Sequence, residues 1–244
     1  MSKRLKFFLI HLSISLIIAL SVVGLVFFAW YPTPLVIAVG VTQIFLMMLS
    51  IDVIVGPLLG LLVYKEGKKT LKFDLSIIVA IQISALCYGL YSIEQGRPAW
   101  LVYNVDRFEL VRKNEIANQN INQAPPQFRY PSWLKPQFVA TEFAKDAKQR
   151  SDDMFTEVLG GISLAQKPQR YVDFAEAKPK IKERARNLKE LLQYNDQKIV
   201  QVTLDKYPAA DAFVPLKANA VDMTVLINKD KGEVIKIVDL RPWK

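Results

Sequence analysis

Residues that build catalytic and redox sites are scarce in this sequence. Its 244 residues include one cysteine, Cys87, and one histidine, His11. One cysteine cannot form an internal disulfide, and one histidine at the start of an apolar stretch excludes Ser–His–Asp sites, Cys–His sites and histidine-rich metal clusters. A glycine-rich phosphate-binding loop is also missing. We therefore expect a protein that is not an enzyme and needs no cofactor or metal, with Cys87 as a small buried packing residue.

Formal charge is nearly absent from three apolar stretches near the N-terminus. The stretches 7–30, 35–64 and 75–93 contain one formally charged side chain, Asp52. About 20 apolar residues suffice to cross the hydrocarbon core of a bilayer. None of the three shows the polar face of an amphipathic core helix, and the first is too long for a cleaved signal peptide. The sequence predicts three transmembrane helices.

Basic residues flank these stretches unevenly. Lys3, Arg4 and Lys6 precede the first stretch, four lysines lie in 65–72, and the short connection at 31–34 carries no charge. Because cytoplasmic loops are enriched in lysine and arginine, we expect the N-terminus to be cytoplasmic and residues 96–244 to lie on the outer side of the membrane. In a Gram-negative cell this means the inner membrane and the periplasm. Part of the net charge of +9 then serves orientation, and we expect no nucleic-acid partner.

The polar remainder of the chain predicts a small α+β domain. Strand patterns occupy 100–105, 108–111, 199–204, 223–227 and 234–238, the last two forming a hairpin around 228–232. Helix patterns occupy 151–159 and 179–192. The segment 114–137, rich in Asn, Gln and Pro, predicts an irregular connection. The predicted fold is thus three transmembrane helices (domain 1–95) followed by an extracytoplasmic α+β domain (96–244).

Several specific strings of residues are distributed over both parts of the chain. They are Tyr31-Pro32-x-Pro34, Asp52-Val53-x-x-Gly56-Pro57-Leu58-Leu59, Gly67-Lys68-Lys69-x-Leu71-Lys72-Phe73-Asp74, Gln82-x-x-Ala85-Leu86-x-Tyr88-Gly89, Arg97-Pro98, Val105-Asp106-Arg107-Phe108-Glu109, Asp222-Met223-Thr224-Val225-Leu226 and Pro242-Trp243. In these strings the chain resembles the TfpX/TfpZ family of type IV pilin accessory proteins. The resemblance implies an inner-membrane protein that helps a cognate major pilin to be stabilised, assembled or displayed.

The second apolar stretch holds the candidate partner-binding residues. A carboxylate within a bilayer is costly and is rarely idle, and Gly56-Pro57 follows Asp52 within about one and a half helical turns. Proline removes a backbone donor and favours a kink, which can open a groove for another helix. Asp52, Gly56, Pro57 and Gln82 are therefore the predicted partner-binding set, with a pilin helix and the lipid bilayer as partners.

Other interpretations stay open at this stage. Asp52 could hold the helices together through Gln43 or Gln82, receive a positive charge from a partner, or serve ion passage. A membrane-anchored sensor or a small transporter subunit is the alternative function. The sequence does not decide whether the chain forms a homo-oligomer.

Overall fold

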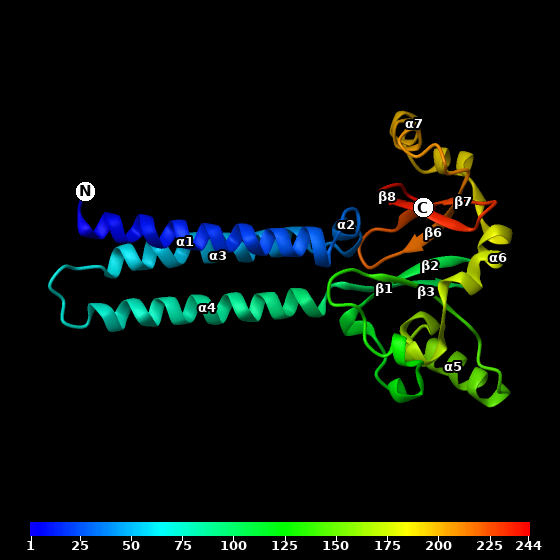
Figure 1. The fold of residues 1–244 in the computed structure, drawn as a ribbon, viewed down its shortest axis with the longest axis horizontal. Coiled ribbons are helices and arrows are strands. Elements are labelled where there is room, and N and C mark those ends of the chain that lie inside the picture. The colour runs from blue at the N-terminus through cyan, green and yellow to red at the C-terminus, as the bar shows by residue number, and fades with distance from the viewer. The chain divides into compact units, whose positions relative to one another are not determined.

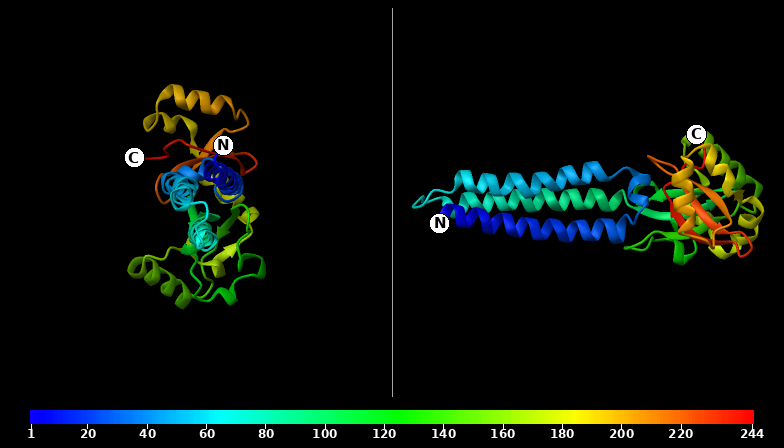
Figure 2. Two further views of the ribbon diagram at one scale, coloured as in Figure 1. Left: turned by 90° about the vertical axis from the view of Figure 1, so that its left-hand side faces the viewer. Right: turned by 90° about the horizontal axis from the view of Figure 1, so that it is seen from above.

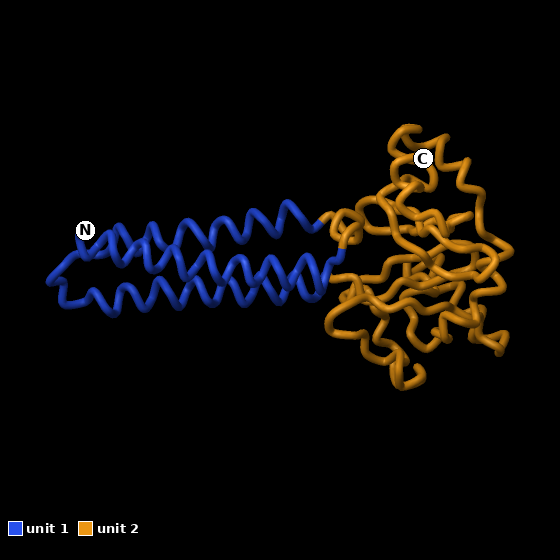
Figure 3. The backbone as a smooth tube through the Cα atoms, turned by 45° about the horizontal axis from the view of Figure 1, so that its top comes forward, with its two compact units in different colours: residues 1–32, 41–96 blue, residues 33–40, 97–244 orange.

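The computed structural model describes residues 1–244 and divides them into two compact units. The helical unit comprises residues 1–32 and 41–96, and the sheet unit comprises residues 33–40 and 97–244 (Figure 3). The predicted class, three long apolar helices followed by an α+β domain, is confirmed.

Three helices form the helical unit. They are α1 (Lys3–Leu25), which continues as a π-helical turn at Val26–Trp30, α3 (Thr42–Val63) and α4 (Leu71–Gln95). Each is long and apolar enough to cross a membrane. Helices α1 and α4 each pack along α3, and the three run side by side (Figures 1 and 2). Most large apolar side chains of the unit point outward, as is expected for helices whose surroundings are lipid.

Tyr31 and Cys87 show how one end of the helical unit is held together and which residues of α4 lie on its surface. The Tyr31 hydroxyl donates to the Ile93 carbonyl at 2.7 Å and joins the end of the first span to the end of the third. The prediction of a buried Cys87 is wrong, because this residue is exposed on α4. Helix α4 contacts its unit along one side only, so most of its small residues face outward.

The expected second span, 35–64, is two helices. A five-residue helix α2 (Leu35–Val39) ends at Gly40, whose left-handed φ of 76° suits glycine, and α3 begins at Thr42. Helix α2 belongs to the sheet unit. Its Leu35 and Ala38 are buried in the core of that unit, and the Ala38 carbonyl accepts from the backbone N–H of Ala220 at 2.9 Å. Apolar composition alone does not distinguish such a buried helix from a span.

One eight-stranded sheet organises the sheet unit. Its strands are β1 (Pro98–Asn104), β2 (Arg107–Arg112), β3 (Gln137–Thr141), β4 (Tyr171–Val172), β5 (Arg186–Asn187), β6 (Ala212–Lys217), β7 (Met223–Asn228) and β8 (Glu233–Val238). The order is β4-β3-β1-β2-β6-β7-β8, with β5 also paired to β6. The pairs β1/β3 and β2/β6 are parallel, and the other pairs are antiparallel.

Both faces of this sheet are covered, which explains its uniformly buried central strands. Successive residues of β1 alternate between the faces: Leu101 and Tyr103 join the core under α2 and α6 (Phe174–Arg184), whereas Trp100 joins a second core on the other face. A third core lies under α7 (Gln197–Asp205) and a 3₁₀ segment at Leu188–Gln193. The remaining helix, α5 (Ala147–Gly160), has no buried residue.

Several local predictions are confirmed. Strands β1 and β2 and the hairpin of β7 and β8 form where expected, and the segment predicted to be irregular contains only short 3₁₀ turns up to the start of β3 at Gln137. The helix predicted at 151–159 exists as α5 but begins earlier, because the Asp146 carboxylate caps it by accepting from the Gln149 N–H at 3.1 Å.

Two local predictions are wrong. The helix expected over 179–192 is α6, which ends at Arg184 because Arg186 and Asn187 pair with β6 and Asn187 then caps a 3₁₀ segment. The strand expected over 199–204 is helix α7. Asp196 accepts from the N–H groups of Lys198 and Ile199, and this cap overrides the strand preference of the β-branched residues that follow.

Candidate functional site: an apolar cavity with four polar side chains

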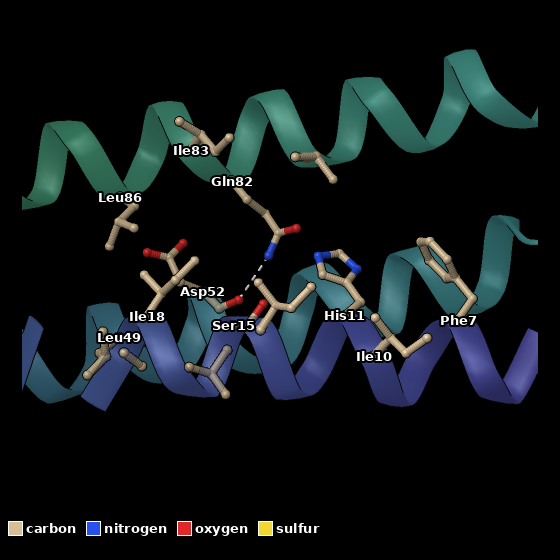
Figure 4. A pocket seen from close by; sticks show the side chains of 14 residues that line it. Phe7, Ile10, His11, Ser15, Ile18, Leu49, Asp52, Gln82, Ile83 and Leu86 are labelled. Carbon is tan, nitrogen blue, oxygen red and sulfur yellow. Dashed lines mark hydrogen bonds between the residues drawn. The ribbon is translucent and has the colours of Figure 1, made fainter. Parts of the chain in front are cut away.

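A cavity of 330 Å³ lies within the helical unit, between α1, α3 and α4 (Figure 4). Its lining is apolar except for four polar side chains. These are His11 and Ser15 from α1, Asp52 from α3 and Gln82 from α4. Polar groups are expensive at membrane depth and face a bundle interior or a water-filled cavity. The placement of all four groups in one cavity follows that rule.

The four residues predicted from the sequence lie together where α3 meets α4. The Gln82 Nε2 amide donates to the Asp52 backbone carbonyl at 3.0 Å. Gly56 and Pro57 are both buried, and a Cβ on Gly56 would overlap the Gln82 amide. Gly56 thus provides the space that this amide occupies. Helix α3 continues through Pro57 to Val63. Pro57 has no N–H to donate to the Val53 carbonyl, and the Asp52 carbonyl, which accepts from Gln82, is the preceding carbonyl along the helix.

Three polar atoms in this cavity are buried and have no hydrogen-bond partner. They are Nδ1 of His11, Oδ2 of Asp52 and Oε1 of Gln82. Gln82 bonds the backbone of Asp52, so it does not satisfy the carboxylate as the bundle-stabilising interpretation requires. An unsatisfied buried polar group costs about 1–3 kcal/mol, more when it is charged. The cavity therefore favours an occupant that brings hydrogen-bond donors.

His11 and Ser15 are absent from the predicted set. They lie one helical turn apart on α1 with Phe7 one turn earlier, and all three line the cavity. Gly60 of α3 allows this side of α1 to approach, since a Cβ there would lie 3.0 Å from Phe7 Cε1 and 3.3 Å from His11 Nδ1. The available signal was that the only histidine of the chain lies within an apolar span.

The chemistry of the cavity suits binding. It offers two unpaired acceptor oxygens and an imidazole nitrogen inside an apolar wall, and no group of three or more His, Cys, Asp or Glu side chains in the structure could hold a metal ion. A ligand that fits is apolar along its length and presents a donor or a positive charge near Asp52.

Comparisons with known proteins agree on one family. A family profile described as fimbrial assembly protein FimB matches residues 1–40. The fimbrial assembly proteins of serogroups E1 and I of Dichelobacter nodosus are 30% and 31% identical to the chain over 230 residues, covering 91% of this chain and 89% of each relative. The protein of serogroups C1 and C2 of the same organism is 36% identical over 117 residues, covering 47% of this chain and 89% of that relative.

No solved structure matches the chain. The sequence relatives therefore carry the assignment. They align with nearly the whole chain, helical unit and sheet unit together, at 30% identity or more. The chain belongs to the fimbrial assembly protein (FimB) family.

Proposed function

We propose that this protein is an inner-membrane accessory protein, of the TfpX/TfpZ type, that assists a cognate type IV pilin in its stability, assembly or display. It acts without catalysis, through contacts with the pilin in the membrane and in the periplasm. Its N-terminus is cytoplasmic and residues 96–244 are periplasmic, as the distribution of basic residues supports. The family assignment supports the role in fimbrial assembly.

The cavity of the helical unit is the observation that carries the proposed mechanism. The partner's apolar helix lies against α1 and α4 and supplies a donor or a cation to Asp52. Asp52 Oδ2 and Gln82 Oε1 are the two acceptors left unpaired there. In lipid, apolar contact gives little drive for association, so interhelical hydrogen bonds and close packing decide which helices pair.

Replacing Asp52 tests this mechanism. Asp52→Asn keeps the size of the side chain and removes its charge. Crosslinking of the protein to pilin should fall about three- to twentyfold, the loss of one interhelical polar contact. Surface pili should fall with it, while the abundance of the protein stays normal. Ser50→Ala is the matched control, because the Ser50 hydroxyl is exposed and bonds only the Leu46 carbonyl of its own helix.

Crosslinking, surface pili and protein abundance, measured in one strain, distinguish the two interpretations of Asp52. Normal crosslinking and normal piliation in the Asp52→Asn strain would contradict recognition through the carboxylate. Loss of the protein itself would show that Asp52 stabilises the helical unit instead. Two C-terminal fusions test the periplasmic placement. An inactive alkaline phosphatase fusion together with a fluorescent green fluorescent protein fusion would contradict it.

A further inference from the structure

Helix α5 turns its apolar side away from its own unit. Met154, Phe155, Val158 and Leu159 are each 63–79% exposed, and no residue of the helix is buried. The helix lies at the periphery of the sheet unit (Figure 1). An apolar helix face normally covers a core, so this arrangement is the reverse of the usual one.

The polar side of α5 faces the body of the unit and fixes this orientation. Asp153 Oδ1 pairs with Lys167 Nζ at 2.9 Å, and Asp153 Oδ2 pairs with Arg170 Nε at 2.7 Å. Their side chains are only 6–15% exposed. Gln149, Asp152 and Thr156 line a polar cavity of 210 Å³ beside these pairs. Rotating the apolar side inward would break a largely buried ion-pair cluster, so the exposure is built into the fold.

The pattern along α5 matches a second copy of itself. Ala147, Ser151, Met154 and Val158 follow the alternating four- and three-residue spacing of a helix–helix seam. On one flank of the seam, Arg150 and Glu157 are seven residues apart, near opposite ends of the helix. In an antiparallel pair the same flank of each helix meets its counterpart. Arg150 of each copy then lies near Glu157 of the other, and the helix dipoles oppose favourably.

Charge disfavours an anionic membrane surface as the occupant. Apart from Asp153, which is paired internally, α5 carries Lys148 and Arg150 against Asp152 and Glu157. A helix that lies on anionic lipid normally has a polar face rich in lysine and arginine. The charges on this helix balance, with both cations preceding both anions along the chain, and they suit a protein surface that presents the same order in reverse.

We propose that α5 is a self-association surface, on which two copies of the chain pair their α5 helices antiparallel through Met154 and Val158. The Arg150–Glu157 contacts occur twice, once on each side of the two-fold axis. A helix of two heptads is too short for a strong pair in dilute solution. Anchoring both copies in one bilayer raises their effective concentration, so a weak contact suffices.

Variants in the full-length protein test this proposal. Fluorescently labelled copies are reconstituted into liposomes at several protein-to-lipid ratios, and dimerisation is followed by energy transfer. Val158→Asp should weaken dimerisation about tenfold or more, because the apolar contact is lost in both copies. Val202→Asp is the control, since Val202 is an exposed apolar residue of α7 (57% exposed) outside the proposed surface.

Charge exchange identifies the second copy as the occupant. Arg150→Glu and Glu157→Arg should each weaken self-association, and the double variant should restore it. The double variant should also pair poorly with the unmodified chain. Failure of the double variant to recover, or dimerisation that Val158→Asp leaves unchanged, would overturn the proposal.

Two further results would also overturn it. One is the absence of energy transfer above random encounter at every density of the unmodified protein. The other is quenching of a probe at Leu159 by labelled lipid in the monomeric protein, which would assign α5 to the bilayer surface. Circular dichroism of each variant confirms that the chain remains folded.

Discussion

The ion pairs of Asp153 allow a quantitative prediction. Asp153→Asn removes the negative charge that compensates two cations, Lys167 and Arg170, whose side chains are 6% and 15% exposed. Removing one partner of a buried ion pair commonly costs about 3–5 kcal/mol. The adjoining polar cavity of 210 Å³ gives water access to the remaining cations, so we expect a smaller loss of about 2–4 kcal/mol in the docking of α5.

The control is the neighbouring carboxylate. Asp152→Asn makes the same chemical change at an exposed position of the same helix, and it should change stability by less than about 0.5 kcal/mol. Urea denaturation of the full-length protein in detergent, followed by tryptophan fluorescence, compares the two variants. Urea is preferred to guanidinium because guanidinium, as a salt, would screen the interaction under test.

Local readouts complete this experiment, because α5 can detach before the sheet unfolds. Cleavage by trypsin after Lys148 and Arg150, both on α5, should be faster in the Asp153→Asn variant and unchanged in the control. Equal stability and equal cleavage rates in the two variants would refute the argument that Asp153 holds α5 in place.

Two further predictions concern the hairpin of β1 and β2. Burial raises the pKa of Tyr103 to about 12. The stability that the neutral phenol contributes is therefore fully present below the pKa of about 10 that tyrosine has in the unfolded chain, and it is lost as pH rises through 12. Tyr103→Phe should therefore make the loss of stability between pH 10 and 12 shallower in pH-dependent urea titrations, whereas the exposed control Tyr130→Phe should not. Val105 adopts a φ of 58°, which is strained for a β-branched residue, so Val105→Gly should raise the free energy of unfolding by about 1 kcal/mol; a lower urea midpoint would contradict that.

The part of the fold that follows from hydrophobic pattern was predictable from the sequence. The three apolar helices, the first hairpin and the last hairpin each show a long or regular pattern flanked by turn residues. Helix α7 was mispredicted because Ile199, Val200 and Val202 favour strands, whereas the Asp196 cap and the contact with Leu191 decide the structure. Strand β6 was missed because five of its six residues are buried in succession and it contains Pro215, so it shows neither the alternating pattern nor the composition typical of a strand.

The candidate site was only partly predictable from the sequence, because its polar residues come from three different helices. Asp52 and Gln82 were identifiable as polar residues in apolar stretches, and the structure places them in one cavity. His11 belongs to a different helix, and its entry into that cavity depends on the approach of α1 to Gly60. Such an approach is a tertiary property that periodicity in one segment does not encode. The direction of the α5 apolar face was equally hidden, since it depends on the partners of Asp153.

Helix α2 changes how the two units can be studied separately. Because Leu35 and Ala38 are buried in the core of the sheet unit, residues 97–244 alone lack part of that core. A chimera meant to test which unit selects the pilin must therefore exchange 33–40 together with 97–244. An exchange of 97–244 alone would create mismatched packing at two buried positions, and loss of function would then report instability instead of specificity. With both segments exchanged, a change in pilin preference would show that the sheet unit selects the pilin. An unchanged preference would show that the helical unit, which contains Asp52, selects it.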